Sequence, residues 1–212
     1  MRIKSGQLGA ALQKELSPVY FITGDEPLQL FESADLIRKV ARKAGYENRE
    51  ILSVDTGFHW NQLAFEADSL SIFADKKIID LRLPSGVIGA EGAKALVNYC
   101  QRLPEDTLLL ITAGKIASSS IKSRWFEVLD VAGVIIQVWP LEGLDLIRWL
   151  EQRMHHRGLT TSTEGLGILA SRIEGNLLAA AQEIEKLFVL YGAGELSTQQ
   201  IFDVVSDSSR YD

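Results

Sequence analysis

Residues 24–30 (Gly-Asp-Glu-Pro-Leu-Gln-Leu) lie between a short apolar run and a helical pattern, where a nucleotide-binding phosphate loop would be expected. Such a loop reads Gly-x4-Gly-Lys-[Ser/Thr], because backbone amides and a lysine neutralise the phosphates while a hydroxyl holds magnesium. Here Gly24 is followed by Asp25 and Glu26, whose carboxylates suit a helix N-terminus but repel a triphosphate. We therefore predict a degenerate nucleotide site at these three residues, which binds no nucleotide and simply begins a capped helix.

Metal-binding and catalytic combinations are equally sparse. A magnesium-binding strand end needs more than one acid, but Asp80 stands alone there, with Leu81 where a water-activating glutamate is needed. The adjacent His155 and His156 would point about 100° apart on a helix, so they cannot share a metal. Cys100 is the only cysteine, which excludes disulfides and multi-cysteine zinc sites. We predict no catalytic residues, no metal site and no cofactor.

Residues 69–73 (Ser-Leu-Ser-Ile-Phe) place three large apolar side chains in a short stretch just ahead of an apolar run. In one interpretation, Leu70, Ile72 and Phe73 are part of the core. In the other, they form an exposed anchor that enters a pocket on a partner. Burying three such side chains contributes roughly 5–9 kcal/mol before association costs, at about 1.5–3 kcal/mol each. The residues alone leave both interpretations open.

Five short apolar runs alternate with helical patterns through the first 140 residues. They are 19–23, 50–54, 77–83, 107–112 and 134–138. Several are apolar at three or four consecutive positions, as in strands covered on both faces. Apolar residues at helical spacing between the runs predict intervening helices. Strands separated by helices imply a parallel sheet, so residues 1–140 are predicted to form a five-stranded α/β domain.

From Leu141 onward no strand signal is present. Apolar stripes predict three helices, the third beginning after Asn176, and Ser197–Gln200 has the spacing of a capping box that opens a short last helix. Pro140 marks the junction, because it cannot continue a strand ladder. We therefore expect residues 141–212 to form a small helical domain.

Composition places the chain among ordinary globular proteins, with 46% hydrophobic and 24% charged residues. The net charge of −6 is unlike the basic excess of a stand-alone nucleic-acid binder. No apolar stretch approaches the ~18–20 residues that span a membrane, and no secretory apolar region opens the chain. We expect a cytoplasmic protein without a membrane partner. Arg38, Lys39, Arg42 and Lys43 are either a solvated helix face or a patch that contacts DNA.

Four segments resemble the N-terminal two-thirds of the delta subunit family of the bacterial DNA polymerase III clamp loader. They are VYFITGDEPLQLFESADLIRK, SLSIFADKKIIDLRLPSG, DTLLLITAGKI with the residues up to Trp125, and GNLLAAAQEIEKL. The resemblance implies an AAA+-like domain over 1–140 that carries a clamp-binding turn, followed by a small helical lid domain over 141–212. The family's third, helical collar domain would begin about where this chain stops and is expected to be absent.

The resemblance also implies a function. Such a subunit binds the ring-shaped sliding clamp (the beta subunit) and opens it for loading onto primed DNA, as a non-catalytic part of the polymerase holoenzyme that does not hydrolyse ATP. The clamp-binding pair would be Ile72 and Phe73, flanked by Leu70 and Ser71. Other loader subunits (gamma/tau and delta prime) would join through the missing domain, and primer–template DNA through the assembly. The alternative is a nucleotide-dependent AAA+ ATPase with an unorthodox phosphate site.

Overall fold

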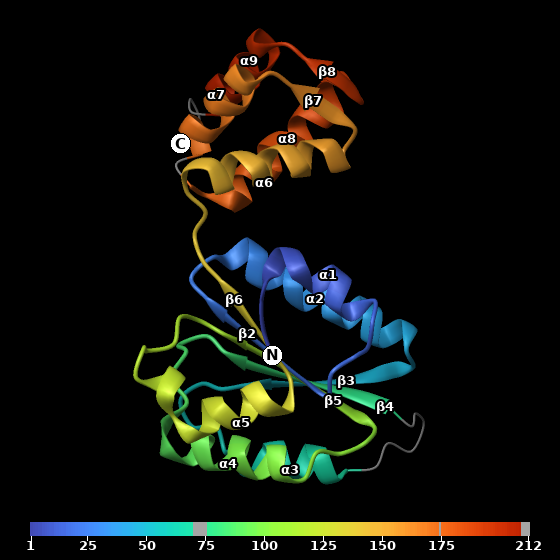
Figure 1. Ribbon diagram of the computed structural model, residues 1–212, viewed down its shortest axis with the longest axis vertical. Helices are drawn as coiled ribbons and strands as arrows, with labels where there is room; N and C mark the ends of the chain where they lie inside the picture. Colours follow the sequence, from blue (N-terminus) through green and yellow to red (C-terminus); the bar gives the residue numbers. More distant parts are fainter. Residues whose placement is uncertain (70–75, 174, 209–212) are drawn as a thin grey trace. The chain divides into compact units, whose positions relative to one another are not determined.

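A computed structural model describes residues 1–69, 76–173 and 175–208 of the chain. The chain divides into two compact units, Met1–Trp139 and Pro140–Asp212. Figure 1 traces both of them from the N-terminus to the C-terminus.

The first unit is built on a parallel sheet with the strand order β1-β6-β2-β5-β4-β3 (Figure 1). The strands are β1 (Arg2–Lys4), β2 (Val19–Gly24), β3 (Tyr46–Ser53), β4 (Lys76–Leu83), β5 (Thr107–Ala113) and β6 (Val134–Val138). The predicted α/β class is confirmed, but the predicted number of five strands is wrong. The N-terminal residues add β1 as a sixth strand at the edge beside β6. Its three residues are exposed or half-buried, so they lack the apolar run that marks the other strands.

Helices cover both faces of this sheet. Figure 1 shows α1 (Leu8–Leu12) and α2 (Pro27–Lys43) on one face, and α3 (Asn61–Asp68), α4 (Gly89–Gln101) and α5 (Arg124–Ala132) on the other. Single 3-10 turns precede α1 and α5, at Ser5–Gln7 and Ser120–Lys122. Each helical layer shares a buried apolar cluster with the sheet. The central strands are therefore covered on both sides, which explains why their sequences show little polar alternation.

The second unit consists of α6 (Gly143–His156), α7 (Thr163–Ile173), α8 (Leu177–Tyr191) and α9 (Thr198–Ser208), with two short strands. These strands, β7 (Leu159–Thr161) and β8 (Gly194–Leu196), pair in parallel. The expectation that no strand follows Leu141 is therefore wrong. Each strand comes just after a glycine with φ +72° at the end of a helix, Gly158 or Gly192, and its three residues are too few to show a strand pattern.

Two helices in this unit begin with side-chain caps, and the cap at Ser197–Gln200 is the one that the sequence predicts. The Asn176 side-chain oxygen accepts a hydrogen bond from the Ala179 N–H at 3.0 Å. The Ser197 N–H donates to Gln200 Oε1 at 2.8 Å, and the Gln200 N–H donates to Ser197 Oγ at 3.3 Å. This reciprocal pair is a capping box, which satisfies two backbone donors at the start of α9.

Candidate functional site

A cavity of about 330 Å³ opens at the carboxyl ends of β2, β4 and β5. Its apolar lining includes Pro27, Leu30 and Phe31 from α2, and its charged lining comes from Asp25 and Arg82. The carboxyl ends of parallel strands are the usual ligand position in α/β folds. This cavity is therefore where the first unit would hold a nucleotide.

Close packing explains the glycine at the mouth of this cavity. Gly24 pairs with Val138 on the neighbouring strand β6. Its φ is +151°, and a Cβ atom built on it would lie 1.7 Å from the Val138 carbonyl oxygen. Any side chain would push the two strands apart. The close approach of β6 thus accounts for Gly24 without a bound phosphate.

The carboxylate of Glu26 uses the backbone donors that a phosphate would need. The residue is 5% exposed, and its side chain accepts hydrogen bonds from the Gln29 N–H at 2.6 Å and the Leu28 N–H at 3.4 Å. Burial raises the pKa of this carboxyl, and the two N–H groups partly offset the rise. In a phosphate loop, the amides at the start of the following helix bind the anion, and the amides at the start of α2 occupy that position. In this chain they cap their own helix.

Asp25 is held at the edge of the same cavity. Its carboxylate lies 2.8 Å from the ammonium group of Lys115, which follows β5. That ammonium also lies over the Trp139 ring, 5.7 Å from the ring centroid. The structure therefore brings Gly24, Asp25 and Glu26 together at the β2–α2 connection. Their assignment as a degenerate nucleotide site stays a prediction.

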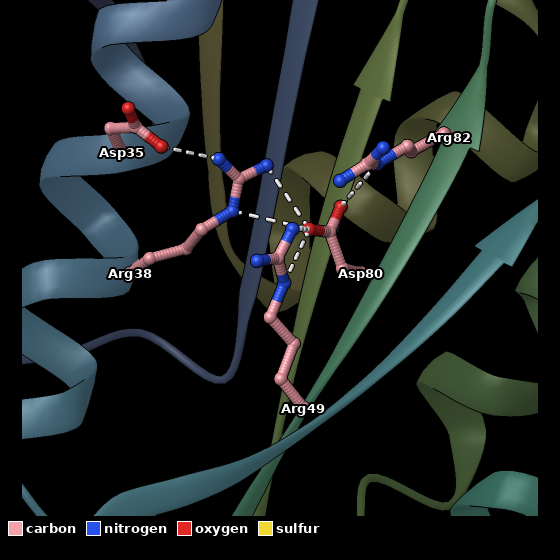
Figure 2. A network of polar contacts seen from close by, with 5 residues as sticks. All are labelled: Asp35, Arg38, Arg49, Asp80 and Arg82. Atoms are coloured by element: carbon pink, nitrogen blue, oxygen red, sulfur yellow. Dashed lines mark hydrogen bonds and ion pairs between the residues drawn. The ribbon is translucent and has the colours of Figure 1, made fainter.

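Asp80 lies within β4 and faces three arginines (Figure 2). It is fully buried, and Oδ2 accepts hydrogen bonds from Arg38 Nε at 3.1 Å and Arg49 Nε at 2.9 Å. Arg82 Nε lies 3.6 Å from Oδ1, which accepts no hydrogen bond. Arg38 also pairs with Asp35, 2.6 Å away on α2. The carboxylate thus joins α2, β3 and β4.

This network decides what Asp80 can do chemically. A magnesium-binding carboxylate must present its oxygens to the ion, with further oxygen ligands around it. The oxygens of Asp80 face guanidinium groups, which would repel a cation. Among the residues that the structure describes, no cluster of three or more His, Cys, Asp or Glu side chains could hold a metal ion.

The predicted clamp-binding residues Leu70, Ser71, Ile72 and Phe73 lie outside the described residues. The elements on either side of them are described: α3 ends at Asp68, and β4 begins at Lys76. The ammonium group of Lys77 joins these two elements, because it donates to Ser69 Oγ at 2.7 Å and to the carbonyl oxygens of Ser69 and Glu66.

The remaining residues considered in the sequence belong to other elements. His155 and His156 are exposed at the end of α6. Cys100 packs against the apolar core, and burial raises the pKa of its thiol to about 11. Within residues 1–69, 76–173 and 175–208, none of the helices has the length and apolar character needed to cross a membrane.

Sequence reasoning missed the partners of the two buried charges on β4. Arg82 is two residues from Asp80 on β4, but Arg38 and Arg49 come from α2 and β3, so no local spacing links them to Asp80. Lys77 looks like one of two adjacent surface lysines that precede an apolar run. A signal was available only for Asp80, which interrupts the apolar run from Ile78 to Leu81.

The comparisons with known proteins agree on one family. The family model described as "DNA polymerase III, delta subunit" matches residues 20–138. The chain is 29% identical over 211 residues to the DNA polymerase III subunit delta of Escherichia coli (strain K12), covering 100% of this chain and 62% of that protein. It is 31% identical over 211 residues to the Haemophilus influenzae subunit, covering 98% and 61%. The chain thus spans about three-fifths of the length of these curated relatives.

Solved structures share the fold. The Bacillus subtilis DNA clamp loader delta protein superposes with a TM-score of 0.71 at 18% identity, covering 93% of this chain and 61% of that one. A Thermotoga maritima RuvB structure, a Holliday junction branch migration motor, gives 0.55 at 13% identity, covering 96% and 66%. These likenesses show that the chain shares its α/β fold with these two proteins.

Proposed function

Because the chain belongs to the family of DNA polymerase III delta subunits, we propose that it is the clamp-binding part of a clamp loader. In this role it binds a ring-shaped sliding clamp and opens the ring for loading onto primed DNA. It does not hydrolyse ATP. Its contribution to the polymerase assembly is a binding function without catalysis.

The observation that carries this proposal is that the polar groups that a nucleotide site would use already serve the fold. The Glu26 carboxylate accepts from the first amides of α2, and the Asp80 carboxylate faces arginines. A triphosphate would have to displace Glu26 and then lie beside Asp25, so both charge and hydrogen bonding oppose it. A subunit with such a cavity is better suited to binding another protein than to using ATP.

We assign clamp binding to Ile72 and Phe73, with Leu70 and Ser71 beside them. Large apolar groups that enter a partner's pocket contribute most of the affinity of many interfaces. The assignment is supported by family membership and by the position of these residues between α3 and β4. In the chain, these residues come just after α3, and Lys77 holds the end of that helix.

Ring opening follows from preferential binding. A subunit that binds the open ring more tightly than the closed ring shifts the population toward the open form, with no energy source of its own. The shift is limited by the difference between the two affinities. ATP-binding partner subunits (gamma/tau) and delta prime would then control when this surface is available, and primer–template DNA would enter through the assembly.

Calorimetric titration with a sliding clamp from the same source tests the proposal. Substituting both anchor residues, I72A/F73A, is expected to weaken binding at least about 100-fold, because two large apolar side chains contribute ~1.5–3 kcal/mol each. The matched control is I51A/F31A, which removes an exposed isoleucine and an exposed phenylalanine from β3 and α2. The control should bind as the unchanged chain does.

The same preparations distinguish the proposal from an ATPase of unorthodox design. Labelled ATP should show no saturable binding to the isolated chain at micromolar concentrations. An I72A/F73A variant with unchanged clamp affinity would reject the assigned residues. Micromolar binding of ATP would reject the non-nucleotide role.

A further inference from the structure

Lys77 is a buried cation near the start of β4. The residue is 7% exposed, and its backbone N–H donates to the Asp106 carbonyl oxygen at 2.9 Å. Its ammonium group points to the end of α3, where it donates to Ser69 Oγ at 2.7 Å and to the carbonyl oxygens of Ser69 and Glu66. An ammonium group has three N–H donors, and these three oxygens match them.

The surroundings of this ammonium group explain why a cation is stable there. The last carbonyl groups of a helix have no partner within the helix, and they carry the negative end of its dipole. Ser69 is already fixed to that helix, because its N–H donates to the Phe65 carbonyl oxygen at 2.9 Å and its hydroxyl donates to the Glu66 carbonyl oxygen at 3.0 Å. Without such partners, a buried ammonium group would be strongly unfavourable.

The contact ties together two points that are eight residues apart in the chain, Ser69 and Lys77. Both points belong to well-held elements. β4 lies between β3 and β5 in the sheet, and α3 buries Leu63 in the core. The connection that begins after Ser69 therefore starts and returns beside the same ammonium group.

We propose that Lys77 is a positioning residue for clamp binding, which holds the two ends of the connection that carries Ile72 and Phe73. The inference rests on the proposed function, because that function assigns these residues to the clamp. A segment with tied ends loses less conformational freedom when it binds, so its affinity is higher than that of an untied segment. Removing the tie lowers affinity although no contact with the clamp is removed.

The neighbouring residue provides a matched control. Lys76 is half-buried, and its ammonium group lies over the Tyr46 ring, 5.3 Å from the centroid. K76M and K77M therefore make the same chemical change on adjacent residues of one strand. K77R adds a conservative variant whose guanidinium group can still donate to the end of α3.

The test measures the clamp dissociation constant of the folded fraction of each variant. Hydrogen exchange of the Ser69 and Lys77 amides is compared in the absence of clamp. K77M is expected to bind about tenfold more weakly and to exchange faster at both amides, because its connection is no longer tied. K76M should match the unchanged chain in both measurements, and K77R should recover most of the lost affinity.

Several results would overturn the proposal. A K77M chain that is less stable but binds with unchanged affinity would make Lys77 a purely structural residue. If K77M does not fold, S69A decides, because it removes one acceptor of the ammonium group. Weaker binding by S69A supports the proposal, and unchanged binding rejects it. Unchanged binding by I72A/F73A would instead reject the proposed clamp-binding residues, so the two failures are distinguishable.

Discussion

Asp80 and Lys77 are both buried on β4, but different kinds of groups compensate their charges. Asp80 lies on the face that α2 covers, and the guanidinium groups of Arg38, Arg49 and Arg82 surround it. Lys77 lies on the opposite face, and the uncharged oxygens at the end of α3 surround it. The first arrangement connects elements inside the fold. The second fixes the place where a connection leaves a helix.

Glu26 belongs with Lys77 in this comparison. Its buried carboxylate is compensated by backbone N–H groups at the start of α2, as the positive end of a helix dipole favours. The two connections considered for function, β2–α2 and α3–β4, thus each contain or adjoin a buried charge held by a helix end. Asp80, which is compensated by other charges, holds α2 and the sheet together. Glu26 and Lys77, which are compensated by helix ends, hold the ends of connections.

The largest expected effect breaks the first arrangement. In D80N the guanidinium groups lose the negative charge on which they converge. Removing one partner of a buried ion pair typically costs about 3–5 kcal/mol, because it leaves uncompensated charge. The arginines are partly exposed, which favours the lower end of that range. Urea denaturation should show a lower free energy of unfolding with an unchanged m-value.

D35N is the control for this prediction. Asp35 pairs with Arg38 at 2.6 Å, but its side chain is 50% exposed. Its loss should therefore cost less than about 1 kcal/mol. If D80N and D35N had equal effects, burial would not be what separates these two carboxylates.

The strand layer could be predicted from the sequence because its signals are local. Runs such as Val19–Thr23 and Val134–Val138 are apolar on both faces of a strand, so the pattern itself reports their burial. β1, β7 and β8 could not be predicted, because three residues carry no period. Their pairing depends on neighbours far away in the chain.

In the candidate site, too, the local features could be predicted from the sequence and the partners from distant elements could not. Asp25 and Glu26 could be excluded as phosphate ligands from their charge alone. The capping contact of Glu26 is local, and so is the spacing of Arg82 from Asp80, but Arg38 and Arg49 come from elements that only the fold brings to Asp80. The same holds for the Lys77 contact, because its partners Glu66 and Ser69 belong to the end of another element.

The second prediction tests a charge held by a helix end. E26A should cost about 1 kcal/mol of unfolding free energy, the usual effect of losing an N-cap side chain. The pKa of Glu26 is raised above its ordinary value of 4.5 in the fold, so its ionised form is less favoured there than in the unfolded chain. The advantage of the unchanged chain over E26A is therefore largest below about pH 4.5, and it falls as pH rises through the raised pKa.

Urea denaturation of both chains at pH 4 and pH 7 measures this change. E26Q is the control, because its neutral amide can still accept a hydrogen bond at either pH. Its difference from E26A should stay constant. An advantage of the unchanged chain that grew with pH would show that the N–H groups of α2 outweigh the burial of the carboxylate.

The smallest expected effect comes from the exposed pair at the cavity edge, which sets the reference for the buried charges. Asp25 and Lys115 are 2.8 Å apart, and their side chains are 37% and 61% exposed. A double-mutant cycle with D25N and K115M should give a coupling of about 0.2–1 kcal/mol, and salt at about 1 M should remove most of it. A coupling as large as the effect of D80N would mean that the cavity edge is rigid and poorly hydrated. In that case exposure would be a poor guide to charge compensation in this unit, and the contrast between Asp80 and the helix-end charges would need a different physical basis.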